Sequence, residues 1–94
     1  MENLELDGRI FRVDEIPVMG STKLLLIQGS RGMLGCGYIS LAAAEKFGHA
    51  LAIVRGVASC GDMLAAKVQE VSSAAAALGV KPGMAGREAL ALMA

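Results

Sequence analysis

Hydrophobic residues in the first part of the chain alternate with polar ones, which is the pattern of half-buried β-strands. Residues 4–6 and 9–18 flank Asp7-Gly8, a pair that tolerates the positive φ angles of a tight hairpin turn. Pro17 has no N–H to donate, so we expect the second arm to lie at a sheet edge or to carry a bulge there. The pattern therefore predicts an N-terminal hairpin.

Two apolar runs follow a predicted turn at residues 19–22. Residues 24–27 are consecutive aliphatic residues between turns, which is typical of a strand covered on both faces. Residues 32–40 contain no charged residue and carry three glycines around Cys36. We interpret this second run as a central strand that presents one thiol, with backbone exposed on either side.

A crossover is predicted in the middle of the chain. Ser40 is a good N-cap for a short helix over residues 41–47, and Gly48 is suited to end it. Residues 51–57 then have the composition of another strand. A strand, a helix and a strand in this order predict two parallel strands joined by a right-handed connection.

The last third of the chain predicts helices. Ser59 and Asp62 have the spacing of a capping box, and a single apolar face then continues to Leu78. This face predicts one helix that is closed by Gly79, followed by a linker and a last helix over residues 85–93. The apolar face of the first of these two helices is formed by Leu64, Val68, Val71, Ala75 and Leu78.

These elements predict one small α+β domain over residues 1–94. We expect four to five mostly antiparallel strands, one βαβ crossover and two to three helices packed on one face of the sheet. Apolar residues make up 54% of the chain, which is high for so small a body. The excess predicts a homo-oligomer, although a monomer with an apolar surface remains the alternative.

Charge and cysteine content exclude several classes of partner. Nine basic and nine acidic residues are scattered without a basic patch, so no nucleic-acid partner is expected. The longest uncharged run, residues 32–44, is too short and glycine-rich to span a membrane. The acidic N-terminus lacks a signal-peptide pattern, and two cysteines suit a reducing compartment. We therefore expect a cytoplasmic protein without a membrane partner.

Three blocks of the chain resemble the YunC-like family, small bacterial and archaeal proteins classed as a domain of unknown function. They are Cys36-Gly37, Arg55-Gly56-Val57 and residues 78–90 with their Gly-Met-Ala-Gly-Arg-Glu-Ala-Leu core. The resemblance implies an α+β fold and no established activity. Two positions depart from the family pattern: Ser40 stands where an acidic or amide residue is expected, and residues 65–67 lack the helix break seen in relatives.

Cys36 is the candidate catalytic residue. A thiol between two glycines can be approached closely, because neither neighbour has a side chain. A catalytic thiol also needs a cation, a histidine or a helix N-terminus nearby. The alternative is a small hydrophobic residue in a packed strand. The spacing of Cys36, His49 and Cys60 does not match a closed zinc motif, so neither a metal site nor a cofactor is implied.

Candidate ligand-binding residues lie around the start of the last helix. Gly83 and Gly86 would leave amides free there, and Lys81 and Arg87 add positive charge, a combination that holds carboxylates or phosphates. The alternative is a glycine turn with solvated charges. Arg55, inside an apolar stretch, needs a partner, which we expect to be a carboxylate or a bound anion. The carboxylates considered are those of Glu45, Asp62 and Glu88.

The leading functional hypothesis is a small self-associating domain that binds a small anionic ligand in a regulatory or structural role. The competing hypothesis is a thiol-dependent enzyme that uses Cys36, with Arg55 or Arg87 holding the substrate. A third hypothesis is a purely structural subunit of a larger assembly.

Overall fold

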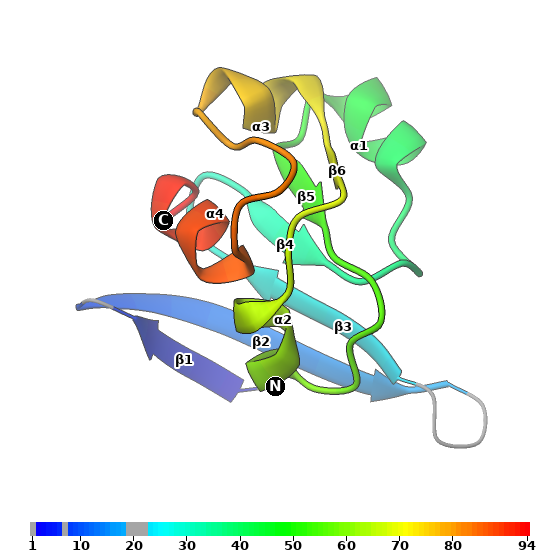
Figure 1. Ribbon diagram of the computed structural model, residues 1–94, viewed down its shortest axis with the longest axis vertical. Helices are drawn as coiled ribbons and strands as arrows, with labels where there is room; N and C mark the ends of the chain where they lie inside the picture. Colours follow the sequence, from blue (N-terminus) through cyan, green and yellow to red (C-terminus); the bar gives the residue numbers. More distant parts are fainter. Residues whose placement is uncertain (1, 7, 19–22) are drawn as a thin grey trace.

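A computed structural model describes residues 2–6, 8–18 and 23–94. These residues form one mixed six-stranded sheet and four short helices (Figure 1). The strands are β1 (Glu2–Leu6), β2 (Arg9–Pro17), β3 (Lys23–Gln28), β4 (Met33–Gly35), β5 (Leu51–Ile53) and β6 (Glu70–Val71). The helices are α1 (Leu41–Phe47), α2 (Cys60–Ala65), α3 (Ser73–Ala77) and α4 (Gly86–Leu92).

The sheet follows the chain order from β1 to β6. The pairs β1–β2, β2–β3 and β3–β4 are antiparallel. Strands β4 and β5 are parallel and are connected through α1, and β6 is antiparallel to β5. Leu6 pairs with Arg9 across the hairpin turn, and Gly8 has a φ of 80°. The predicted hairpin and parallel crossover are therefore confirmed, whereas Asp7 and the predicted turn at residues 19–22 lie outside the described residues.

Pro17 lies in a part of β2 that pairs with β3 but not with the described part of β1. The described part of β1 pairs with β2 only as far as Val13, whereas Pro17 pairs with Lys23 of β3 on the other side. The predicted edge position or bulge is wrong, because β2 lies between β1 and β3 and pairs with β3 in unbroken register through Pro17. The missing N–H of proline removes no hydrogen bond to β1, since no described residue of β1 lies opposite Pro17.

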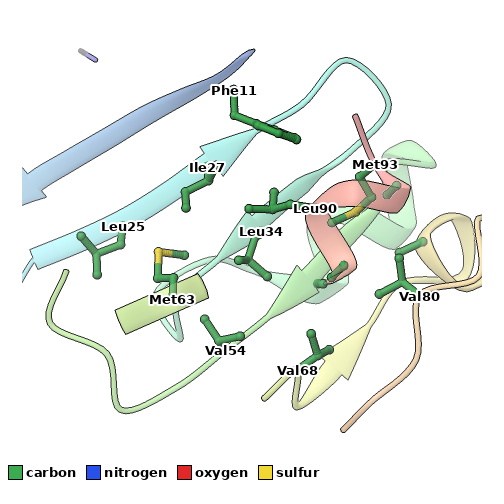
Figure 2. Packing of buried hydrophobic residues seen from close by; sticks show 14 of the residues in the cluster. Phe11, Leu25, Ile27, Leu34, Val54, Met63, Val68, Val80, Leu90 and Met93 are labelled. Carbon is green, nitrogen blue, oxygen red and sulfur yellow. The ribbon is translucent and has the colours of Figure 1, made fainter. Parts of the chain in front are cut away.

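The two faces of the sheet are covered unequally. Alternate residues of β2, β3 and β4 point into one large core beneath α2 and α4, which Figure 2 shows from close by. Its largest fully buried side chains include those of Phe11, Leu25, Ile27, Leu34, Met63 and Leu90. A second cluster lies on the opposite face, where Ala44 of α1 packs with Leu51 and Ile53 of β5. The opposite face is thus covered at the β4–β5 end.

The α+β class is confirmed, with two differences from the expected architecture. The sheet has six strands instead of four to five, because Glu70 and Val71 add a short strand to β5. The helices do not all pack on one face, because the apolar residues of β5 point alternately to both sides and α1 covers the second side.

The predicted continuous helix from Ser59 to Leu78 is wrong. Helix α2 ends at Ala65, and Ala66 has an extended backbone with φ −71° and ψ 152°. Backbone hydrogen bonds explain the break: the Ala66 carbonyl accepts from Gly86 N–H, and Gln69 N–H donates to the Ile53 carbonyl. Periodicity alone could not reveal these distant partners, which favour a strand over a continued helix.

None of the helices in the described ranges is long and apolar enough to cross a membrane.

Candidate functional site

A cavity of about 500 Å³ lies at the carboxyl end of the parallel pair β4–β5. It is lined by residues 36–38, which follow β4, by residues 55–58, which follow β5, and by Lys23 at the start of β3. We call it the thiol cavity. Figure 1 shows the connection that carries residues 55–58 running from the end of β5 down to α2. Carboxyl ends of parallel strands meet at one edge of a sheet, which is where open α/β sheets place their ligands.

Cys36 is fixed in the wall of the thiol cavity by the backbone of β3. Its N–H donates to the Leu25 carbonyl at 3.1 Å, and Leu25 N–H donates to the Cys36 Sγ at 3.3 Å. Cys36 is only 5% exposed, which agrees with a packed residue, yet it also lines the cavity. The predicted strand over residues 32–40 ends at Gly35, and Ile39 N–H donates to the Cys36 carbonyl in the turn that follows.

Close packing requires a glycine at Gly35 but not at Gly37. A Cβ added to Gly35 would collide with the side chain of Ile39. A Cβ added to Gly37 would lie 3.6 Å from the Nε of Arg55, which is ordinary contact. The Arg55 side chain thus passes beside Gly37 with room for a Cβ, and the structure brings the two predicted site residues Cys36 and Arg55 to one cavity.

Arg55 lies beyond the end of β5 and is about half exposed. Its Nη2 lies 3.1 Å from the Glu70 Oε2, and Gly56 turns the chain with a φ of 73°. The partner is thus neither Glu45, Asp62 nor Glu88. Glu70 was not considered because its segment was interpreted as helix, whereas β6 places it beside β5.

Lys23 is a second cation of the thiol cavity that the sequence analysis did not identify. Its Nζ lies 3.6 Å from the Glu15 Oε1, and the Glu15 Oε2 accepts a hydrogen bond from Cys60 N–H at 3.2 Å. Hydrogen bonds from Cys60, and then the charge of Lys23, lower the pKa of the Glu15 carboxyl. No residue pattern around Lys23 signals this position, because the cavity depends on the pairing of β3 with β4.

The other sulfur and imidazole groups lie elsewhere. Cys60 is the first residue of α2 and does not line the thiol cavity. His49 is exposed, with its ring 6.0 Å from that of Phe47. Within residues 2–6, 8–18 and 23–94, no three histidine, cysteine or acidic residues are grouped to hold a metal ion.

The predicted amides at the start of α4 already have protein partners. Gly83 N–H donates to the Val68 carbonyl, and Gly86 N–H donates to the Ala66 carbonyl, each at 2.8 Å. Gly86 is buried, since a Cβ there would collide with the Met63 carbonyl. These glycines therefore serve packing and hydrogen bonding between loops.

The two predicted cations of this segment do not reach the thiol cavity. Lys81 is exposed in the loop before α4, and Arg87 lines a separate hollow beside β1 and β2. The structure therefore unites Cys36 with Arg55 and leaves Lys81, Gly83, Gly86 and Arg87 outside that site.

The charges around the thiol cavity favour an anion. Lys23 and Arg55 line it from different strand ends, and the lining residues within 2–6, 8–18 and 23–94 include no acidic one. Tyr38 and Val57 add apolar surface. Glu15 and Glu70 each hold one of the cations, but these ion pairs are partly exposed, and such pairs contribute little and are readily exchanged.

Comparison with known proteins gives a family without an assigned activity. The family model described as "Domain of unknown function (DUF1805)" matches residues 35–93. A crystal structure of a protein of unknown function from Thermoplasma acidophilum is similar, with a TM-score of 0.91 and 32% sequence identity. The similarity covers 99% of this chain and 90% of that one. No curated protein matches the chain.

Proposed function

Because the chain belongs to the DUF1805 family, a domain of unknown function, we propose a function from the cavity itself: it binds a small anionic ligand in the thiol cavity. The observation that carries this proposal is the meeting of two cations, Lys23 and Arg55, at the carboxyl end of the one parallel strand pair described. The volume of the thiol cavity, about 500 Å³, lies within the range of small-molecule binding sites.

Arg55 is the residue through which the ligand is expected to bind most directly. One of its terminal nitrogens contacts Glu70, and a guanidinium carries five N–H donors, so donors remain for a carboxylate or phosphate. Gly37 and Gly56 have no side chains that would hinder approach to this group. A ligand with a short apolar part would contact Tyr38 and Val57.

The test is thermal unfolding in the presence of phosphate, sulfate, acetate and citrate. A ligand that binds only the native state raises the unfolding midpoint, and Arg55→Gln should abolish most of that rise. Lys81→Gln is the control, because Lys81 is an exposed cation that lies outside the cavity and outside the surface proposed below for self-association. Equal shifts in both variants would contradict binding through Arg55.

Self-association is the second part of the proposal, and it is supported by an uncovered apolar face on β2 and β3. We call this surface the open face: Ile10, Ile16, Val18, Leu24 and Leu26. Ile10 is 69% exposed and Ile16 is 53% exposed, although both lie in strands. A monomer gains nothing from such side chains in water.

A second copy of this chain is the partner we propose for the open face. Arg12 and Asp14 lie on the same face of β2 as Ile10 and Ile16, and they form an ion pair of 3.4 Å. A two-fold axis through this face would place the arginine of one copy near the aspartate of the other, which makes the face self-complementary.

Light scattering tests this assembly at micromolar concentration. Ile16→Asp should reduce the mass of the particle to that of one chain, since it puts an unpaired charge in the interface. Phe47→Asp is the control, because Phe47 is 67% exposed but lies on α1, away from the open face. A wild-type particle with the mass of one chain would refute the proposal.

A thiol-dependent reaction is the alternative function. It is favoured by one observation: the Leu25 N–H donates to the Cys36 Sγ inside a cavity that also holds two cations. Labelling with iodoacetamide across a pH series, in Cys60→Ser to isolate Cys36, tests it. A Cys36 that stays unreactive near neutral pH in the folded protein would exclude the enzyme.

A further inference from the structure

A second hollow, of about 240 Å³, lies between the N-terminal hairpin and α4. Its walls are Arg9 of β2 and Arg87 of α4, and its lining is completed by Leu6, Phe11 and Ala91. Arg87 and Ala91 are four residues apart and so share one face of α4. We call this site the arginine hollow, and it has no lining residue in common with the thiol cavity.

Arg9 is held in place, while Arg87 has no partner among the described residues. The Nη1 of Arg9 donates to the Ala91 carbonyl at 2.9 Å, which joins the hairpin to the last turn of α4. No hydrogen bond or ion pair from the Arg87 guanidinium is formed with any residue within 2–6, 8–18 and 23–94. One arginine thus has a fixed position, and the other has all its donors available.

Both positive charges remain uncompensated within the described part of the chain. The ion pairs formed there involve Arg12, Lys23 and Arg55, and none of the described residues that line the arginine hollow is acidic. Two guanidinium groups that line one hollow repel each other, and a bound anion reduces that repulsion. Planar guanidinium groups also match the oxygen geometry of carboxylates and phosphates.

We propose that the arginine hollow is a second anion-binding site, specific for a small oxyanion such as inorganic phosphate or a short carboxylate. Its volume is below the range of about 300–1,000 Å³ that holds drug-sized ligands, so a nucleotide does not fit. Phe11 is 1% exposed beneath the site, which gives the hollow a packed base. Ala91, whose side chain is small, also lines the hollow and leaves room in it.

A purely structural role explains Arg9 but not Arg87. The Arg9 bond to the Ala91 carbonyl satisfies an acceptor at the end of α4 and would exist without any ligand. Arg87 contributes no such bond within the described residues, so its removal should leave the fold intact. Arg87 therefore gives the cleaner test, and Arg9 is left unchanged.

The experiment follows backbone amide signals by NMR while phosphate or acetate is added to the folded protein. Phosphate should shift the amides of Leu6, Arg9 and Ala91, and Arg87→Gln should weaken this binding about tenfold or more, as expected for one lost charge-assisted hydrogen bond. Lys81→Gln removes the same charge from an exposed loop residue outside the hollow and should bind as the wild type does.

Two further outcomes decide between sources and sites. Ala91→Leu should block binding without changing any charge, because its side chain fills the space between the arginines. A stronger response to phosphate than to acetate assigns a phosphate ligand, and the reverse assigns a carboxylate. Equal binding by Arg87→Gln and Lys81→Gln, or amide shifts confined to Gly37 and Gly56, would overturn the proposal. The second result would leave the thiol cavity as the anion site.

Discussion

The two halves of the sheet are built differently, and the difference explains where the candidate site lies. Strands β1 to β3 contain five, nine and six residues, are antiparallel, and leave one face open. Strands β4 to β6 contain three, three and two residues, and α1 covers the second face of β4 and β5. We call strands β1 to β3 the long half of the sheet and strands β4 to β6 the short half. The long half is mostly strand, whereas much of the chain around the short half lies in the connections between strands.

Because the strands of the short half end early, residues of the candidate site lie in loops. Because β4 stops at Gly35 and β5 stops at Ile53, Cys36 and Arg55 lie in the connections just beyond the parallel pair. Loops held on a rigid sheet are common positions for binding residues. The short half must then be stabilised by something other than long strand ladders, namely close backbone approach and buried polar contacts.

The largest predicted effect tests close backbone approach. Gly86→Ala would place a Cβ against the Met63 carbonyl and the Leu34 side chain, so α4 must move away from α2 and β4. We expect the free energy of unfolding to fall by about 3 kcal/mol, at the upper end for overpacked sites. Urea unfolding measures the change, with the midpoint lowered and the slope unchanged.

Gly61→Ala is the matched control for that change. Gly61 lies inside α2, where an added Cβ meets nothing closer than the Ser59 Oγ at 3.7 Å. Alanine is favoured over glycine in a helix by about 1 kcal/mol, so this variant should be slightly more stable than the wild type. Similar losses in both variants would show that close approach at Gly86 is not what holds the short half together.

A smaller effect is expected from the buried polar contact between β5 and α3. The fully buried Ser72 Oγ accepts from Leu51 N–H at 2.9 Å, accepts from Ala75 N–H and donates to the His49 carbonyl at 2.8 Å. Ser72→Ala leaves these groups without their partner, and each unsatisfied buried group costs about 1–3 kcal/mol. We expect a loss of about 2 kcal/mol in urea unfolding, after partial relaxation.

The comparison for Ser72 is Ser40, which caps α1 from an exposed position. Its Oγ accepts only from Ala43 N–H at 3.1 Å, so Ser40→Ala should cost about 1 kcal/mol or less. If Ser40→Ala destabilises the protein as much as Ser72→Ala does, burial of the Ser72 contacts contributes little to the short half.

The sequence predicted the long half better than the short half for a physical reason. The hairpin and the apolar strand at residues 24–27 depend on neighbours in sequence, and the structure confirms both elements. The strand is not covered on both faces as expected, because Leu24 and Leu26 lie on the open face. The break after Ala65 depends on hydrogen bonds to Ile53 and to the loop before α4. Those partners are distant in sequence, so local periodicity favoured a helix that does not form.

The candidate site was predicted to a similar, partial extent. Cys36 and Arg55 were identified from their unusual local surroundings, a thiol between glycines and a cation in an apolar stretch. Lys23 and Glu70 were missed, because each reaches the site region through strand pairing that local patterns do not encode. Arg87 was predicted to hold an anion together with the glycines close to it in sequence. The structure instead places it in one hollow with Arg9, which is distant in sequence.

The smallest predicted effect concerns Glu15, which joins the two halves by contacting Lys23 and Cys60. Hydrogen bonds from Cys60, and then the charge of Lys23, lower the pKa of Glu15 below its ordinary value of 4.5. Its contacts therefore stabilise the fold above that pH and are lost as the pH falls through the lower, folded pKa. Glu15→Gln should lower the free energy of unfolding slightly at neutral pH, by about 0.5 kcal/mol or less for so exposed a group, and not in strong acid.

Lys23→Gln separates the two causes of this pH dependence. Hydrogen bonds from Cys60 lower the Glu15 pKa more than the charge of Lys23 does, so the variant should keep most of the wild-type loss of stability in acid. Unfolding midpoints measured from neutral pH to below 4.5 for the wild type and both variants give the answer. If Lys23→Gln removes the pH dependence of stability as completely as Glu15→Gln does, the Glu15–Lys23 ion pair within the long half is its main cause. The contact of Glu15 in β2 with Cys60 in α2 would then not link the two halves.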